Sequence, residues 1–259
     1  MVTHNRRTVL KSAGGLALVG TLAGCAGGGG GDGEESGDGT ETNESDGEMD
    51  SDDGESEPDA SIRVAHLSPD APNVDVYLDG DAVLEDVPYR TVSDYLDVQS
   101  GTYQVMITAA GDMDTVVYDE ELEVPAGEFT IAALGELADE NEAFGVEVYE
   151  DDVSDPGEEA RVRLVHAAPD APNVDVTAGG NALFTDVPFG AAGTISVAPD
   201  DYTLAVRPAT ENNDGDVVAE FDISPEAGVV YTGFAVGYLA PDEAPTDAAF
   251  DLELAVDAE

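Results

Sequence analysis

The stretch His66-Leu67-Ser68-Pro69-Asp70-Ala71-Pro72-Asn73-Val74-Asp75-Val76 returns as His166-Ala167-Ala168-Pro169-Asp170-Ala171-Pro172-Asn173-Val174-Asp175-Val176. Nine of the eleven positions are identical, and the offset is 100 residues. Further along, Asp86-Val87-Pro88-Tyr89 matches Asp186-Val187-Pro188-Phe189 at the same offset. A period of about 100 residues is too long for a solenoid repeat. The sequence therefore predicts two homologous domains in tandem.

Apolar residues around the repeated motif alternate with a period of two, which predicts β-strands. The alternation is clear in Ile62-Val64-His66 and in Tyr103-Val105-Ile107. Asp79-Gly80 in the first copy and Gly179-Gly180 in the second separate two such runs, and both dipeptides favour a tight primed hairpin. We expect an all-β fold of two tandem antiparallel β-sandwich domains of immunoglobulin-like type. A small barrel is the alternative.

The chain divides into five segments on composition. These are a signal peptide (1–25), an acidic linker (26–60), a first β-sandwich repeat (61–150), an inter-domain linker (151–160) and a second repeat (161–256).

The N-terminal segment has the features of an export signal. Arg6 and Arg7 precede a short apolar run, which is typical of a twin-arginine signal. The run is about half of the ~20 residues that a spanning helix needs. Leu22-Ala23-Gly24-Cys25 resembles the lipobox of prokaryotic lipoproteins, and the resemblance implies a diacylglyceryl lipid on Cys25. We expect an exported protein that this lipid anchors to the outer face of the cell membrane.

Charge is the most unusual property of the composition. The chain has 58 acidic residues against 8 basic ones, and three of the basic residues lie in the signal. The remaining net charge is 5 − 58 = −53. Such self-repulsion is tolerable only where salt screens it, since the Debye length falls to about 3 Å at molar ionic strength. The composition resembles that of extreme halophiles. It argues against a nucleic acid partner, because few cations remain to neutralise phosphates.

The linker at 26–60 consists mainly of Gly, Asp, Glu and Ser, with 14 acids and no basic residue. It has too few apolar residues to form a core, so we expect a disordered spacer. Asn43 begins an Asn-Glu-Ser sequon that permits glycosylation. Cys25 is the only cysteine, which leaves no partner for an intramolecular disulfide.

The repeated segment resembles the domain-of-unknown-function 4397 family. The shared features are the opening Arg-Val-x-His-x-x-Pro-Asp-Ala-Pro-x-Val-Asp-Val, a hairpin, a Val-Pro-aromatic step and Gly-Thr-Tyr-x-Val. The second copy departs from this pattern at Asp200-Asp201-Tyr202. The resemblance implies extracytoplasmic β-sandwiches without an established activity.

Two interpretations of the repeated His/Asp motif remain open. In the structural one, each histidine lies at the end of a core strand and hydrogen-bonds the Pro-Asp-Ala-Pro loop. In the other, the motif holds a metal such as zinc, since imidazole and carboxylates suit such a cation. The candidate ligands are His66, Asp70 and Asp75 in the first copy and His166, Asp170 and Asp175 in the second.

Tyr103 and Tyr202 are expected to pack in the cores, with a tyrosine-corner hydrogen bond as the second interpretation. Asn212-Asn213-Asp214-Gly215-Asp216 superficially resembles a calcium loop, but a solvated hairpin tip fits it better. No cofactor is expected apart from the covalent lipid on Cys25, and zinc or calcium belongs to the alternative, metal-binding interpretation.

No Gly-x-Ser-x-Gly elbow or phosphate-binding loop occurs. We therefore expect a non-enzymatic surface lipoprotein for binding or envelope structure and adhesion, with envelope proteins or glycans as partners. A metal-binding module or metal-dependent enzyme is the alternative.

Overall fold

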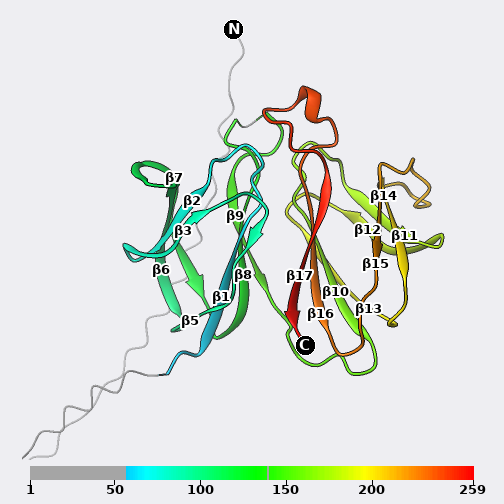
Figure 1. Cartoon of the computed structure of the whole chain (residues 1–259), viewed down its shortest axis with the longest axis horizontal. Coiled ribbons are helices and arrows are strands. Elements are labelled where there is room, and N and C mark those ends of the chain that lie inside the picture. Colours follow the sequence, from blue (N-terminus) through cyan, green and yellow to red (C-terminus); the bar gives the residue numbers. More distant parts are fainter. Residues whose placement is uncertain (1–56, 139) are drawn as a thin grey trace, which may run out of the picture. The chain divides into compact units, whose positions relative to one another are not determined.

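The computed structural model describes residues 57–138 and 140–259. The predicted signal, Cys25, Asn43 and nearly all of the acidic linker lie outside these ranges. Among the described residues, no helix has the length and apolar character needed to cross a lipid bilayer. Apart from one turn of 3₁₀ helix at Pro241–Glu243, their regular structure is β (Figure 1).

The first repeat is a sandwich of two sheets. One sheet has the order β4-β1-β8-β9, with β5 also pairing with β1, and the other has the order β3-β2-β6-β7. The strands are β1 (Ala60–His66), β2 (Val74–Leu78), β3 (Asp81–Val87), β4 (Thr91–Val92), β5 (Leu96–Val98), β6 (Gly101–Ala109), β7 (Asp112–Val124), β8 (Gly127–Leu134) and β9 (Gly145–Glu150).

The second repeat has the same plan. Its sheets have the orders β13-β10-β16-β17 and β12-β11-β14-β15. The strands are β10 (Ala160–His166), β11 (Val174–Ala178), β12 (Asn181–Val187), β13 (Ala192–Val197), β14 (Tyr202–Pro208), β15 (Ala219–Ile223), β16 (Val230–Val236) and β17 (Asp251–Ala258). The prediction of two all-β sandwiches is confirmed.

One strand pair in each repeat is parallel. β1 runs parallel to β8, with Arg63 opposite Thr130, and β10 runs parallel to β16, with Arg163 opposite Thr232. The sheets are therefore mixed, where the sequence predicted antiparallel ones. Alternation shows which face of a strand is buried. It carries no information on the direction of the neighbouring strand.

Both predicted hairpins are confirmed. Asp79 and Gly80 have φ values of 51° and 91°, and Gly179 and Gly180 have 56° and 83°. Two consecutive positive φ values give the primed turn whose twist matches the flanking strands. The turns join Leu78 to Asp81 and Ala178 to Asn181 as directly paired residues.

Three apolar clusters hold the structure together. One lies inside the first sandwich and includes Ile62 and Val64, and a second lies inside the second sandwich around Leu164 and Val176. The third joins the repeats: Ala65, Leu67, Ala132 and Leu134 of the first pack with Val165, Ala167, Phe234 and Val236 of the second. Two sheets consequently bury apolar side chains on both faces, on one face in the core of their own sandwich and on the other against the second sandwich.

Candidate functional site

Each repeated histidine is completely buried and bonded to the loop that follows it. The Nε2 atom of His66 lies 3.0 Å from the carbonyl oxygen of Pro72, and that of His166 lies 3.1 Å from the carbonyl oxygen of Pro172. Burial lowers the pKa of both imidazoles, although the carbonyl contacts partly oppose this. A neutral imidazole that donates from Nε2 therefore holds the Pro-Asp-Ala-Pro loop in both repeats.

The aspartate of each Pro-Asp-Ala-Pro loop forms hydrogen bonds with the backbone of a second loop. Both carboxylate oxygens of Asp70 accept backbone N–H bonds of 2.8 Å, from Leu137 and Ala138. Asp170 accepts the equivalent bonds from Leu239 and Ala240 at 2.8 and 2.9 Å. These carboxylates therefore stabilise the loops that leave β8 and β16.

The aspartate at the end of the motif stabilises a strained turn. Asp75 accepts bonds of 2.8 Å from the backbone N–H groups of Asp86 and Gly111. Asp86 has a φ of 54°, an uncommon backbone conformation for a non-glycine residue. Its own carboxylate accepts a bond of 2.8 Å from the Asn73 side chain, so motif residues hold it from both sides.

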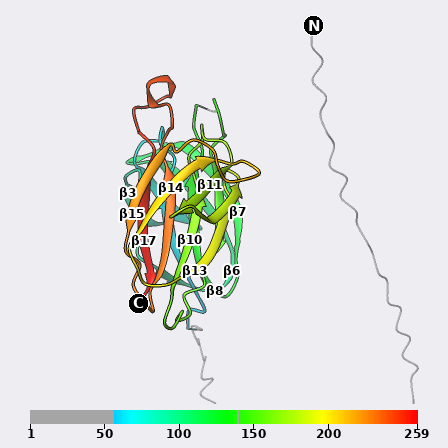
Figure 2. The same cartoon turned by 90° about the vertical axis from the view of Figure 1, so that its right-hand side faces the viewer.

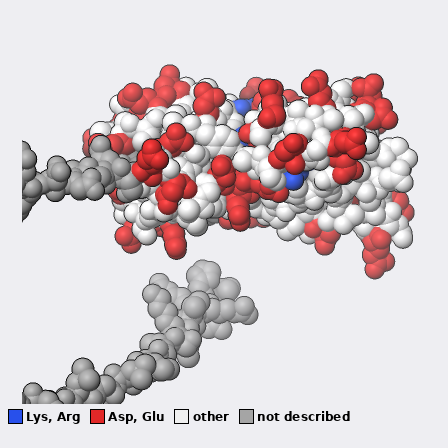
Figure 3. All heavy atoms as spheres, turned by 90° about the horizontal axis from the view of Figure 1, so that it is seen from below, with Lys and Arg blue, Asp and Glu red and all other residues white. Residues whose placement is uncertain are grey.

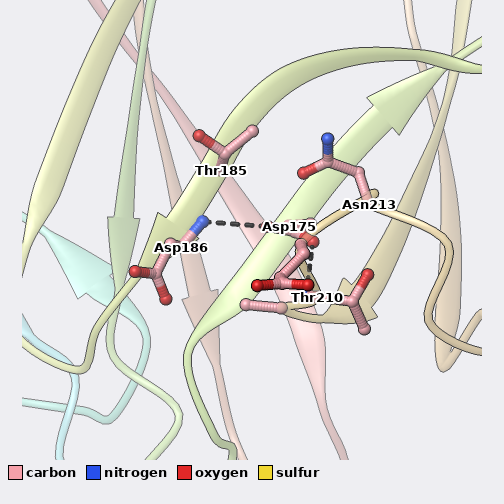
Figure 4. A pocket seen from close by; sticks show the side chains of 7 residues that line it. Asp175, Thr185, Asp186, Thr210 and Asn213 are labelled. Atoms are coloured by element: carbon pink, nitrogen blue, oxygen red, sulfur yellow. Dashed lines mark hydrogen bonds between the residues drawn. The ribbon is translucent and has the colours of Figure 1, made fainter.

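The second repeat reproduces this arrangement beside a surface hollow of about 450 Å³, whose lining includes Asp175, Asp186 and Asn213. Figure 4 shows the Asp175 carboxylate accepting the backbone N–H groups of Asp186 (2.8 Å) and Thr210 (3.0 Å). Both oxygens of Asp175 are thus engaged by the protein's own backbone.

The candidate metal ligands are not arranged as a metal centre. Within residues 57–138 and 140–259, no three His, Cys, Asp or Glu side chains form a group that could hold a metal ion. In each repeat the histidine contacts a carbonyl, and the two aspartates contact different backbone segments. Each motif side chain thus acts separately and stabilises a nearby loop by hydrogen bonds to its backbone.

Tyr103 and Tyr202 combine the two roles considered for them. Both pack against the cores of their sandwiches. The Tyr103 hydroxyl donates a bond of 2.6 Å to the carbonyl of Gln99, and that of Tyr202 donates one of 3.0 Å to the carbonyl of Ala198. Each bond reaches four residues back along the chain, which is the geometry of a tyrosine corner.

A buried polar site lies between the repeats. Arg63 and Arg163 project from β1 and β10 on the side opposite the sandwich cores, and their side chains are 2% and 8% exposed. Each Nε donates to the threonine opposite on the parallel strand, Arg63 to Thr130 at 2.9 Å and Arg163 to Thr232 at 3.0 Å. The two arginines thus occupy equivalent positions.

Each arginine forms its closest ion pair with the other repeat. Arg63 lies 2.7 Å from Asp257 at the end of β17, and Arg163 lies 2.6 Å from Asp151, which follows β9. Thr130 and Thr232 bond the same two aspartates. The Tyr95 hydroxyl also donates to Asp151, at 2.7 Å. We call this group, Arg63, Arg163, Asp151, Asp257 and the two threonines, the junction network.

Further contacts surround the junction network. Arg90 crosses to Asp251 and Glu253 at 2.7 and 3.2 Å. The Tyr149 hydroxyl donates to the carbonyl of Gly190 at 2.9 Å, and its ring lies under the guanidinium of Arg163. Three of the five arginines in the described chain thus form ion pairs between the repeats. Figure 3 shows how sparse cationic side chains are on one acidic face.

Sequence reasoning missed this network. It placed Asp151 in the inter-domain linker, whereas the structure buries its side chain to 1% exposure. The available signal was the pair Arg63 and Arg163, two charges at the same offset of 100, each in a strand whose neighbours are apolar. A charge on the outer face of such a strand indicates that a partner surface covers that face.

These features define a tandem β-sandwich protein whose repeats are fused through a buried polar junction. The chain belongs to the family described as Domain of unknown function (DUF4397), whose model matches residues 60–177 and 160–257. No curated protein matches the chain.

Two solved structures show weak similarity. The chain is similar to CBMbc, a family CBM26 module from Eubacterium rectale Amy13K solved in complex with maltoheptaose. The identity is 11%, the coverage is 77% of this chain and 97% of that chain, and the TM-score is 0.24. The Bacillus anthracis TIE protein gives 12% identity, 69% and 34% coverage, and a TM-score of 0.23. With TM-scores this low, neither structure is evidence for the fold or the function of this chain.

Proposed function

We propose that this protein is a non-enzymatic surface lipoprotein in which the two repeats act as one rigid body for binding or for envelope structure. The observation that carries the proposal is the position of the few arginines in this acidic chain. The chain has 58 acids, yet Arg63 and Arg163 are buried where each joins one repeat to the other. Removing charges from water is costly, so this placement favours a fixed two-repeat unit.

The repeated motif supports a structural role for its polar groups. His66, Asp70 and Asp75 each bond the backbone of a nearby loop, and the second repeat copies these bonds. Side chains held in this way give stiffness and leave the outer surface to make contacts. The proposal therefore assigns recognition to the exterior of the two-repeat body.

The proposed location of the protein rests on sequence features outside the described residues. A lipid on Cys25 and the acidic linker at 26–60 would hold the body outside the membrane in concentrated salt. At molar ionic strength long-range charge attraction is screened. Partners would then be recognised by shape, hydrogen bonds and apolar contact, which suits envelope glycans or envelope proteins.

The anchoring part is tested by fractionating cells that carry Cys25→Ser. We expect the protein to leave the membrane fraction for the medium, or to keep its signal. Ser12→Ala, a change in the signal outside the lipobox, is the matched control and should stay in the membrane fraction. Unchanged fractionation and mobility of Cys25→Ser would overturn the anchor.

The binding part is tested by sedimenting the purified Cys25→Ser protein with isolated cell envelopes in molar KCl. We expect saturable sedimentation. Periodate treatment of the envelopes would abolish it for a glycan partner, and protease treatment would abolish it for a protein partner. The absence of saturable sedimentation at any envelope concentration would overturn binding to envelopes.

A further inference from the structure

The strand β17 is an open edge. Among the strands of residues 57–138 and 140–259 it pairs with β16 alone, so one side of its backbone has no strand neighbour there. Such an edge can accept another strand. β17 is eight residues long and contains neither proline nor glycine, which are among the residues that interrupt pairing. Its side chains Leu254 and Val256 are 45% and 51% exposed.

The first repeat protects the equivalent strand. Asp151 and Asp257 have the same role in the junction network, so β9 corresponds to β17 at an offset of 106. Val148, the counterpart of Leu254, packs against the first core, and the counterpart of the exposed Val256 is the acidic Glu150. The edge strand of the first repeat therefore carries a charged side chain, which hinders pairing with another strand. The edge strand of the second repeat has an apolar side chain at that position.

The facing sheet shows the same difference. Strand β7 has 13 residues, whereas its counterpart β15 has five. Glu120 lies opposite Val105 on β6, while Phe221 lies opposite Leu204 on β14. In Figure 2, β15 and β17 lie along one side and β7 along the other. At this position the second repeat therefore carries an aromatic side chain where the first carries a charge.

Charge also sets β17 apart. Its three carboxylates all have arginine partners within the chain: Asp251 and Glu253 contact Arg90, and Asp257 contacts Arg63. Most surfaces of so acidic a chain would repel another copy. Two arginines thus offset most of the charge of three carboxylates, so β17 can approach a second acidic chain at lower electrostatic cost.

We propose that β17 is a self-association edge, at which two copies of this chain pair antiparallel about a two-fold axis near Leu254. An isologous contact needs a self-complementary patch. Pairing about Leu254 would set Leu252 of one copy opposite Val256 of the other, on one face of the joined sheet. A groove of about 450 Å³ lies along Glu253–Val256, between β17 and the segment Thr91–Asp94.

The test uses the full mature chain with Cys25→Ser, at rising concentration in molar KCl, measured by sedimentation equilibrium. We expect a monomer–dimer equilibrium. Val256→Glu, which introduces the residue found at the equivalent place in β9, should raise the dissociation constant at least tenfold. Val116→Glu is the matched control, since Val116 is 45% exposed in the other repeat, and it should leave the constant unchanged.

A second measurement fixes the interface. Single cysteines replace Leu252, Leu254 or Val116 in the Cys25→Ser background, and oxidation is followed on non-reducing gels. We expect disulfide-linked dimers to form fastest for Leu254→Cys. A chain that stays monomeric at every concentration overturns the proposal. So does a dimer that Val256→Glu leaves intact and that Leu254→Cys does not cross-link, because its interface lies elsewhere.

Discussion

Arg163, on the first strand of the second repeat, lies 2.6 Å from Asp151, the residue that follows the last strand of the first. Arg63 reaches Asp257 in the reciprocal way at 2.7 Å. Each repeat therefore supplies the aspartate that pairs with a buried arginine of the other repeat. Together with the apolar cluster between the repeats, this exchange makes them one structural unit.

Breaking one of these buried pairs should destabilise the whole protein. Removal of one partner leaves an uncompensated charge and costs about 3–5 kcal/mol. We expect Arg163→Met to lower the free energy of unfolding by this order in molar KCl, measured by denaturant titration. Arg207→Met is the control, because Arg207 bonds only within its own repeat, and it should cost about 1 kcal/mol.

The double variant Arg163→Met/Asp151→Leu separates the lost charge balance from lost packing. Apolar replacement of a whole buried pair is often neutral or stabilising. We expect it to recover much of the stability that Arg163→Met loses. A double variant as unstable as the sum of the two single changes would contradict this account of the junction network.

The motif aspartates should be structural in both repeats. Asp75→Ala removes the carboxylate that accepts from the backbone N–H groups of Asp86 and Gly111, and a hydrogen bond to a charged group contributes about 1.5–3 kcal/mol. We expect a clear drop in the midpoint of thermal unfolding, and the same drop for Asp175→Ala. Asp81→Ala, at an exposed position beyond the first hairpin, is the control.

The same variants give a direct test of metal binding. Zinc or calcium added to the wild type in equilibrium dialysis should show no stoichiometric uptake. Uptake that Asp75→Ala abolishes would contradict the structural role of this motif.

Acid should weaken the fold through the two buried histidines. Burial places the folded-state pKa of His66 and His166 below the ordinary value of 6.5, so the unfolded chain binds more protons between the two values. The stabilisation that the two neutral, buried histidines contribute is complete above pH 6.5 and is lost progressively as the pH falls below it. We expect the free energy of unfolding to decline from pH 7.5 to 5, and His66→Gln/His166→Gln to reduce that slope.

The tyrosine corners should contribute modestly. Tyr103→Phe keeps the ring in the core and removes only the hydroxyl that bonds the carbonyl of Gln99. We expect a loss of about 1 kcal/mol, and a similar loss for Tyr202→Phe. Tyr118→Phe, whose hydroxyl has no such bond among those described, should change stability less. Equal losses at all three positions would show that the corner geometry has no special effect.

Much of the fold was accessible from the sequence because local rules dictate it. Alternation around Ile62 and Val64 indicates the buried face, and Asp79-Gly80 and Gly179-Gly180 specify the hairpins. The 100-residue offset between His66 and His166 indicates the duplication. Each of these signals lies within a few residues or compares the chain with itself.

The junction network was not accessible in that way. Asp151 and Asp257 are two among 58 acidic residues, and nothing local distinguishes them from solvated carboxylates. Their role depends on which strand ends meet when two sandwiches pack together. The parallel pairing of β1 with β8 is hidden for the same reason, since alternation is identical in both strand directions.

The pairing of Arg63 with Asp257 has a consequence for biogenesis. The two residues are separated by 194 positions (257 − 63), so the closest ion pair of Arg63 can form only after the final strand has emerged from the ribosome. Closure of the junction network would then be a late event in folding. The twin-arginine export route that we expect from Arg6 and Arg7 would accept only a completed fold, and this long-range ion pair would make completion all-or-none.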